Sequence, residues 1–354
     1  MKKYVYYLLA LLLLAFTFAG CTTDTLEIAE EPPEEPPVEE AIPEDDEEDS
    51  DTESLLEDLF NELFGDGSGS AFLAETMTSE EMQAFEAEHA VSEAQERYLA
   101  FGAFLFVRNG ESPRVLAVSA PQNRTVQMLR NSWSVTDHES AMEQLTRLAN
   151  ADGQSPIAND IFHTLVRNGE LEPLDPFEMF FNEVDLSGLE NVYHNAVNRA
   201  ERMPDEFELF FEMLDVPEEY RDEAFELFVL FELTDRVNRG LEAYLGARDL
   251  LIDSFGFTEE ELLSIESLNA WDYGRATTIA RYGVSAGFLE EDEVWGYLKL
   301  AADSAAMAYN SWREYTAAYI LGRALAFGNS SWDFNFALDF LLNHSESPFV
   351  RIPF

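Results

Sequence analysis

The sequence is short of cysteine, because Cys21 is the only one among its 354 residues. A disulfide needs two thiols, so none can form within one chain. The fold must therefore depend on its core. About 300 residues rich in Phe, Leu and Ala follow position 53. That length is ample for one large or two modest domains.

Basic residues are also scarce. Lysine and arginine number 21 against 70 aspartates and glutamates, which gives a formal net charge of −49. Without Lys2 and Lys3 the charge is −51, and subtracting the 16 acids of residues 21–53 leaves −35 for residues 54–354. Such a field repels phosphates and anionic headgroups, so we expect no nucleic-acid partner. It attracts cations or basic partners, although a merely solvated acidic surface is the more ordinary interpretation.

The sequence lacks the ligand spacings of metal and phosphate sites. Neither a His-Glu-x-x-His nor a Gly-x-x-x-x-Gly-Lys pattern occurs. A calcium loop with Gly153 at its sixth position would need an acid at Leu148. The histidines are scattered singly: His89, His138, His163, His194 and His344. We predict no metal site and no cofactor.

The chain has one long apolar run, from Val5 to Ala19, and Lys2 and Lys3 precede it. A membrane-spanning helix needs roughly 20 apolar residues, whereas this run supplies only about 15. The pattern is typical of a secretory signal peptide, which we place at residues 1–20.

The tetrad Phe18-Ala19-Gly20-Cys21 resembles the lipobox of bacterial lipoproteins, with Phe18 where Leu is usual. The resemblance implies cleavage before Cys21, a diacylglyceryl group on its thiol and acyl chains such as palmitate. Two or three acyl chains anchor a protein stably. The alternative is a cleaved signal peptide followed by a spare thiol. We predict an exported lipoprotein, anchored to the bacterial cell membrane or outer membrane and facing the extracytoplasmic side of the cell envelope.

Residues 21–53 form a segment with no basic residue and two Pro-Pro pairs. It cannot bury enough apolar surface to offset its ordering entropy, so we predict a disordered acidic tether after the lipidated Cys. N-terminal helices are expected over residues 54–121. A helical domain is expected over residues 122–354, with an acidic Phe-rich helical segment at about 176–256.

Helical patterns recur along the rest of the chain and predict an all-α, multi-helix globular domain. Thr78 with Glu81, and Thr136 with Glu139, have the spacing of capping boxes at helix starts. Residues 113–120 are the only strand candidate.

Two charges lie on an apolar face of a predicted helix. On a helical wheel, Asp272 and Arg275 share a stripe with Ile279, whereas Arg281 points the other way. Gly283 is the expected helix stop. A charge on a core face must be paired, because an isolated one is costly.

A second predicted helix, with Ser311 as its cap, gathers Trp312, Tyr319 and Arg323 on one face. Gly322 at the edge of that face would let another helix approach closely.

We predict that Asp272 bridges Arg275 on its own helix and Arg323 on the facing helix, clamping the two together. Because two arginines exceed one aspartate, a further acid is expected, and Glu290 or Glu291 is the nearest choice. The aromatic rings expected to flank the guanidinium groups are those of Trp271, Trp312 and Tyr319.

The segments NAWDYGRATTIARYGVSAGFLEEDEVW and YNSWREYTAAYILGRALAF follow each other, and LRNSWSVTDHESAMEQLTRLANADG lies upstream. In this order they resemble the bacterial family known as domain of unknown function 1266, over residues 122–327. The resemblance implies a helical domain and no established activity. Its signature positions here are Trp271, Asp272, Arg275, Trp312, Gly322 and Arg323.

A catalytic interpretation has little support. The string at residues 283–287 matches Gly-x-Ser-x-Gly, with Ser285 as nucleophile and His344 as base. That motif needs a preceding strand, whereas a helix is predicted here, so an ordinary interhelical turn is favoured. A pair of carboxylates near a cleft is the other catalytic possibility, and no spacing singles one out. We name no catalytic residue, and a hydrolase is the least favoured function.

The leading hypothesis is a binding or envelope-interaction module with an unidentified protein or peptide partner. The alternative is a receptor for a small anionic ligand or peptide. In it, Arg275 and Arg323 receive a carboxylate while Trp271 or Trp312 stacks on the ligand.

Overall fold

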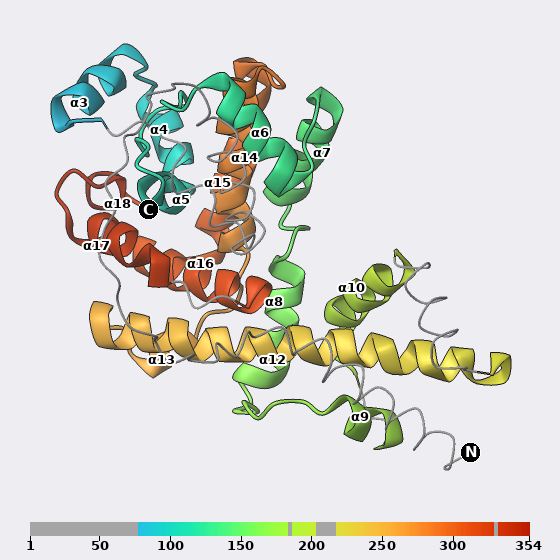
Figure 1. The fold of residues 1–354 in the computed structure, drawn as a ribbon. Helices are drawn as coiled ribbons and strands as arrows, with labels where there is room; N and C mark the ends of the chain where they lie inside the picture. The colour runs from blue at the N-terminus through green and yellow to red at the C-terminus, as the bar shows by residue number, and fades with distance from the viewer. Residues whose placement is uncertain (1–76, 183–185, 203–216, 329–331) are drawn as a thin grey trace, which may run out of the picture.

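A computed structural model describes residues 77–182, 186–202, 217–328 and 332–354 (Figure 1). Within these ranges every regular element is a helix and no strand occurs, which confirms the all-α prediction. The predicted leader, Cys21 and the tether lie outside them. The helices are α3 (Ser79–Glu88), α4 (Glu93–Ala100), α5 (Ala103–Arg108), α6 (Gln122–Trp133), α7 (His138–Ala149), α8 (Ser155–Ile161), α9 (Pro176–Asn182), α10 (Glu190–Glu201), α12 (Arg221–Phe255), α13 (Glu259–Leu263), α14 (Ala270–Ala286), α15 (Glu291–Ala308), α16 (Trp312–Phe327), α17 (Asn335–Asn343) and α18 (Pro348–Arg351).

Helix α14 is the centre of the fold. Helices α5, α6, α7, α15 and α16 all pack against it, and α16 packs along the long helix α12 (Figure 1). Every residue from Ala270 to Gly283 is buried. The prediction that Arg281 faces away from the core is therefore wrong, because α5 and the loop of residues 113–120 cover that side of α14.

The helix starts follow local capping chemistry. The predicted box at Thr78 and Glu81 is present, since each side chain accepts the backbone N–H of the other residue. Ser311 caps α16 as predicted and accepts the N–H of Glu314 at 3.1 Å. These bonds satisfy N–H groups that have no partner within the helix.

The predicted box at Thr136 and Glu139 is wrong by one residue. Asp137 caps α7, and its carboxylate accepts the N–H of Ser140 at 2.9 Å. The Ser140 hydroxyl accepts the N–H of Asp137 in return, at 3.1 Å. A carboxylate is as good a cap as a hydroxyl, so the helix begins at the later residue.

The predicted stop at Gly283 is also wrong, because α14 continues to Ala286 and ends at Gly287. Gly287 has φ 76°, a left-handed conformation that glycine adopts without strain. Gly283 is needed for space instead. A Cβ there would lie 2.6 Å from Cδ1 of Leu289.

Residues 113–120 form a loop and not the strand considered above. In a sheet, the Leu116 and Ala117 carbonyl groups would bind a neighbouring strand. Here they accept hydrogen bonds from a side chain instead. The Arg281 guanidinium donates Nε–H to Leu116 at 3.2 Å and Nη2–H to Ala117 at 2.7 Å. The loop is held to α14 by these bonds.

Candidate functional site

Asp272 and Arg275 form the predicted ion pair on α14. Residues three positions apart lie on the same helix face, so the pair is local. Asp272 is 0% exposed and Arg275 is 4% exposed. The pair is therefore enclosed in the core.

The Asp272 carboxylate also binds the start of α8, a contact that the sequence did not reveal. It accepts backbone N–H groups from Gly153 at 2.9 Å, Gln154 at 3.1 Å and Ser155 at 3.1 Å. Together with Arg275 these donors fill the roughly four acceptor positions of a carboxylate. Asp272 thereby joins α14 to a turn more than 100 residues earlier in the chain.

Arg275 lies among aromatic rings. Its Cζ is 4.9 Å from the ring centroid of Trp271, 5.7 Å from that of Trp133 and 5.8 Å from that of Phe327. Its Nη1 donates to Oε1 of Gln154 at 3.2 Å. Burial lowers the pKa of the guanidinium, and the Asp272 charge opposes that change. The predicted contact with Trp271 is confirmed.

The predicted bridge from Asp272 to Arg323 is wrong. Asp272 has no acceptor position left, and Arg323 pairs with Asp333 at 3.3 Å. Arg108 of α5 binds the same carboxylate at 2.7 Å. Both guanidinium groups lie over the Phe334 ring, with Cζ at 4.8 Å for Arg323 and 5.2 Å for Arg108. The structure therefore has two separate ionic clusters, one enclosed in the core around Asp272 and one around Asp333, whose side chain is 33% exposed.

The further acid that the charge count required is Asp333, and neither Glu290 nor Glu291 supplies it. Both glutamates are exposed at the start of α15. The Glu290 N–H donates to the Glu293 carboxylate at 2.8 Å, as in an ordinary helix cap.

Trp312 does not flank a guanidinium as predicted. Its ring stacks on Phe349 with centroids 4.2 Å apart and planes 8° apart. Its Nε1–H donates to the Ile352 carbonyl at 2.8 Å. Trp312 therefore holds the C-terminal segment against α16.

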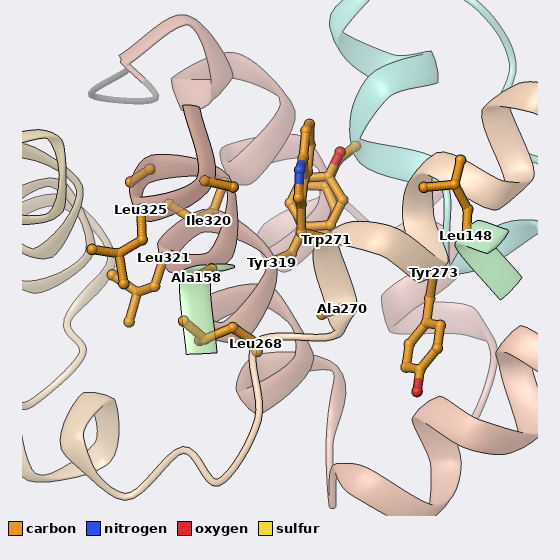
Figure 2. Packing of buried hydrophobic residues seen from close by; sticks show 14 of the residues in the cluster. Leu148, Ala158, Leu268, Ala270, Trp271, Tyr273, Tyr319, Ile320, Leu321 and Leu325 are labelled. Atoms are coloured by element: carbon orange, nitrogen blue, oxygen red, sulfur yellow. The ribbon is translucent and has the colours of Figure 1, made fainter. Parts of the chain in front are cut away.

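Tyr319 and Gly322 bring α16 against α14. The Tyr319 ring lies edge-to-face with Trp271, at a centroid distance of 5.2 Å, and Figure 2 shows the two side by side. A Cβ at Gly322 would lie 2.8 Å from the Leu268 carbonyl oxygen and 3.1 Å from Cβ of Trp271. The predicted close approach at Gly322 is confirmed.

Arg281 is the buried charge that sequence reasoning missed. It is 0% exposed, and its Cζ lies 3.6 Å from the centroid of Phe106. Burial lowers its pKa to about 10. One signal was available. Between Tyr273 and Ala286 the only charged residues are Arg275 and Arg281, which is typical of a helix with no solvent face.

A family model described as "Protein of unknown function (DUF1266)" matches residues 128–354, which is 227 of the 354 residues. The chain belongs to the DUF1266 family. The match includes Asp272, Arg275, Arg323 and Asp333, whereas Arg108 precedes it. No curated protein and no solved structure matches the chain.

Ser285 lies inside the last turn of α14 in this DUF1266 chain. It is therefore neither on an interhelical turn nor on the strand-to-helix turn that a nucleophile elbow needs. Its hydroxyl lies 3.4 Å from Oγ1 of Thr125. The geometry gives no support to Ser285 as a nucleophile.

The DUF1266 domain has an open groove of about 500 Å³ between α7 and α15. The groove borders the turn that binds Asp272, because Asp152 lines it and Gly153 follows. Its lining residues are Met142, Glu143, Thr146, Arg147, Asn150, Asp152 and Tyr297.

In the ranges that the structure describes, no group of three or more His, Cys, Asp or Glu side chains is placed to hold a metal ion. None of the helices in the same ranges combines the length and the apolar character needed to cross a membrane.

Proposed function

We propose that this DUF1266 protein is a membrane-tethered binding module whose binding face is formed by the α7–α15 groove and the outer face of α15. The observation that carries this proposal is a pair of exposed apolar side chains beside the groove. Leu300 is 41% exposed and Met307 is 83% exposed, both on α15. Exposed apolar surface next to a groove is typical of an interaction site.

The groove and the exposed apolar side chains belong to one surface. Tyr297 lines the groove, Leu300 follows it by three residues, and Met307 follows by ten. At 100° per residue these three side chains lie within about 80° of one another on the helix. A partner in the groove can therefore cover Leu300 and Met307 as well.

The chemistry of this face favours a peptide or protein segment. The groove is wide open to solvent, so it suits a segment lying on the surface better than an enclosed small molecule. The carboxylates of Glu143 and Asp152 flank the groove, and Arg147 lies with them. Because residues 54–354 carry a net charge of −35, a partner with apolar and basic side chains is favoured over an acidic one.

The Arg–aromatic cluster has less support as a receptor for a peptide or anionic ligand from solution. Asp272, Arg275 and Arg323 are at most 6% exposed. Trp312 is engaged with Phe349 and Ile352. A bound peptide would need these helices to separate.

The binding face is tested by photo-crosslinking in intact cells, with a benzophenone amino acid at Met307. The control carries it at Phe181 on α9, which is also apolar and is 53% exposed. We expect one discrete crosslinked species from position 307 and none from position 181. Equal patterns from both positions, or no product from position 307, would contradict the proposal.

The membrane anchor is the second part of the proposal and is supported by the lipobox resemblance at Cys21. Growth with a labelled fatty acid should label the wild-type protein and leave Cys21→Ser unlabelled. Equal labelling of the two proteins would refute lipidation at this residue.

A further inference from the structure

The turn of residues 150–155 presents one carboxylate to the α7–α15 groove. Asp152 lines the groove and is exposed. Its carboxylate forms no hydrogen bond and no ion pair with any residue that the structure describes. Its backbone is held, because the N–H of Asp152 donates to the Arg147 carbonyl at 2.9 Å. The side chain is therefore open to a partner, on a backbone that is fixed.

This turn lies directly on the buried ion pair. Asp272 accepts the N–H groups of the three residues that follow Asp152. Gly153 leaves no space between the turn and the pair, because a Cβ there would lie 2.6 Å from Oδ1 of Asp272 and 2.8 Å from Nη2 of Arg275. The pair in the core therefore fixes where Asp152 stands at the surface.

The residue before Asp152 is strained. Ala151 has φ 58°, a left-handed conformation that is costly for a residue with a Cβ. It is buried at 6% exposure, and its N–H donates to the Leu148 carbonyl at 3.0 Å. Such strain persists only where the surrounding structure enforces it, and it is concentrated at binding and active sites. The turn is thus held in a costly shape that directs Asp152 into the groove.

The charges that line the groove favour a basic group. Glu143 is its second carboxylate, and it too forms no hydrogen bond or ion pair with a described residue. Arg147, the one cation among the lining residues, donates Nη2–H to Oε1 of Gln144 at 2.9 Å on its own helix. The short side chain of Asp152 on a fixed turn has less freedom to lose on binding than Glu143 has.

We propose that Asp152 is the residue of the α7–α15 groove that selects a lysine or arginine side chain of the partner, and that Asp272 positions it through the turn. The basic group donates a charge-assisted hydrogen bond to the Asp152 carboxylate. Asp272 touches no partner itself. The inference rests on the proposed function, because it names the chemistry that the same groove recognises.

The test uses the full chain in intact cells, with the benzophenone amino acid at Met307. Asp152→Asn removes the charge and keeps the size, and it should lower the yield of the crosslinked species by about threefold or more. The amount of this variant in the cells should equal that of the wild type, since the carboxylate has no partner within the described fold. Arg147→Gln should not lower the yield. Glu139→Gln, on α7 outside the groove, controls for net charge and should leave the yield unchanged.

A double-variant cycle tests the positioning by Asp272. Asp272→Asn should lower the yield per molecule of chain when Asp152 is present, and should lower it no further in the Asp152→Asn background. A general loss of folding would lower the yield by the same factor in both backgrounds, and that result would refute the positioning role.

The remaining outcomes separate this inference from the proposed function. No crosslinked species from position 307 in the chain without other substitutions would refute both. A crosslinked species whose yield is unchanged in Asp152→Asn would overturn this inference alone. A yield that falls in Arg147→Gln and rises in Asp152→Asn would show an acidic partner, and would overturn it as well.

Discussion

Arg281 offers the sharpest test of how the core tolerates charge. Its guanidinium is fully buried, faces Phe106 and donates to the Leu116 and Ala117 carbonyl groups. Replacement by methionine keeps an unbranched side chain of similar reach. It removes the donors and leaves two carbonyl groups of the 113–120 loop without them.

The expected loss of stability in Arg281→Met follows from one unfavourable and two favourable contributions of the guanidinium. Burial lowers the Arg281 pKa from 12.5 to about 10, which corresponds to a penalty of roughly 3 kcal/mol for the charged form in the fold. Two hydrogen bonds from a charged donor contribute about 1.5–3 kcal/mol each. The cation–π contact adds about 2 kcal/mol. The favourable contributions exceed the penalty, and we expect Arg281→Met to destabilise the fold by about 2–5 kcal/mol.

The assay is urea unfolding combined with hydrogen exchange of residues 111–120. A base with a folded pKa near 10 and an unfolded pKa near 12.5 is protonated in both states at lower pH. The loss of unfolding free energy in Arg281→Met should therefore be equal at pH 6 and pH 8. Hydrogen exchange of residues 111–120 should be faster than in the wild type at both. Arg130→Met on the exposed side of α6 is the control and should stay within about 0.5 kcal/mol of wild type. If the unfolding free energy of Arg281→Met changes no more than that of this control, and the exchange of residues 111–120 is unchanged, Arg281 does not hold the loop and its buried charge does not stabilise the fold.

Two further predictions concern close packing and acid stability. Gly322→Ala places a Cβ 2.8 Å from the Leu268 carbonyl oxygen and should cost about 1–3 kcal/mol in urea unfolding. Its control is Gly296→Ala on α15, where no atom of the described residues lies within 4 Å of the added Cβ outside the helix itself, and which should gain up to about 1 kcal/mol from helix propensity. The hydrogen bond from Arg313 lowers the pKa of Glu261 from 4.5 to about 2, so the pair stabilises the fold above pH 4.5 and loses its effect as pH falls toward 2. Because Glu261 is half exposed, we expect at most about 1 kcal/mol, measured as the difference in acid unfolding between wild type and Glu261→Gln.

Local features could be predicted from the sequence. The Asp272–Arg275 pair and the caps at Thr78 and Ser311 depend on residues three positions apart, and helical geometry fixes such neighbours. The close approach at Gly322 was predictable too, because a glycine on a helix edge leaves room for a neighbouring backbone.

The distant partners could not be predicted. Asp272 binds a turn more than 100 residues away, and one sequence gives no information on which loop meets which helix. Arg323 forms its ion pair with Asp333, because the Asp272 oxygens are occupied by the N–H groups of that turn and by Arg275. Arg281 was assigned to a solvent face because the wheel assumes one, whereas α14 has none.

The central claim is that the charged signature residues of this DUF1266 chain form an enclosed framework, so that binding takes place on its surface. The most direct test compares Asp272→Asn with Arg275→Met in urea unfolding. Asp272→Asn leaves a buried guanidinium without its counter-charge and disturbs three backbone donors, so it should cost about 3–5 kcal/mol. Arg275→Met should cost less, because the carboxylate keeps those three N–H groups. If Asp272→Asn instead stays within about 0.5 kcal/mol of wild type, the fold does not need this charge, and the framework account is contradicted.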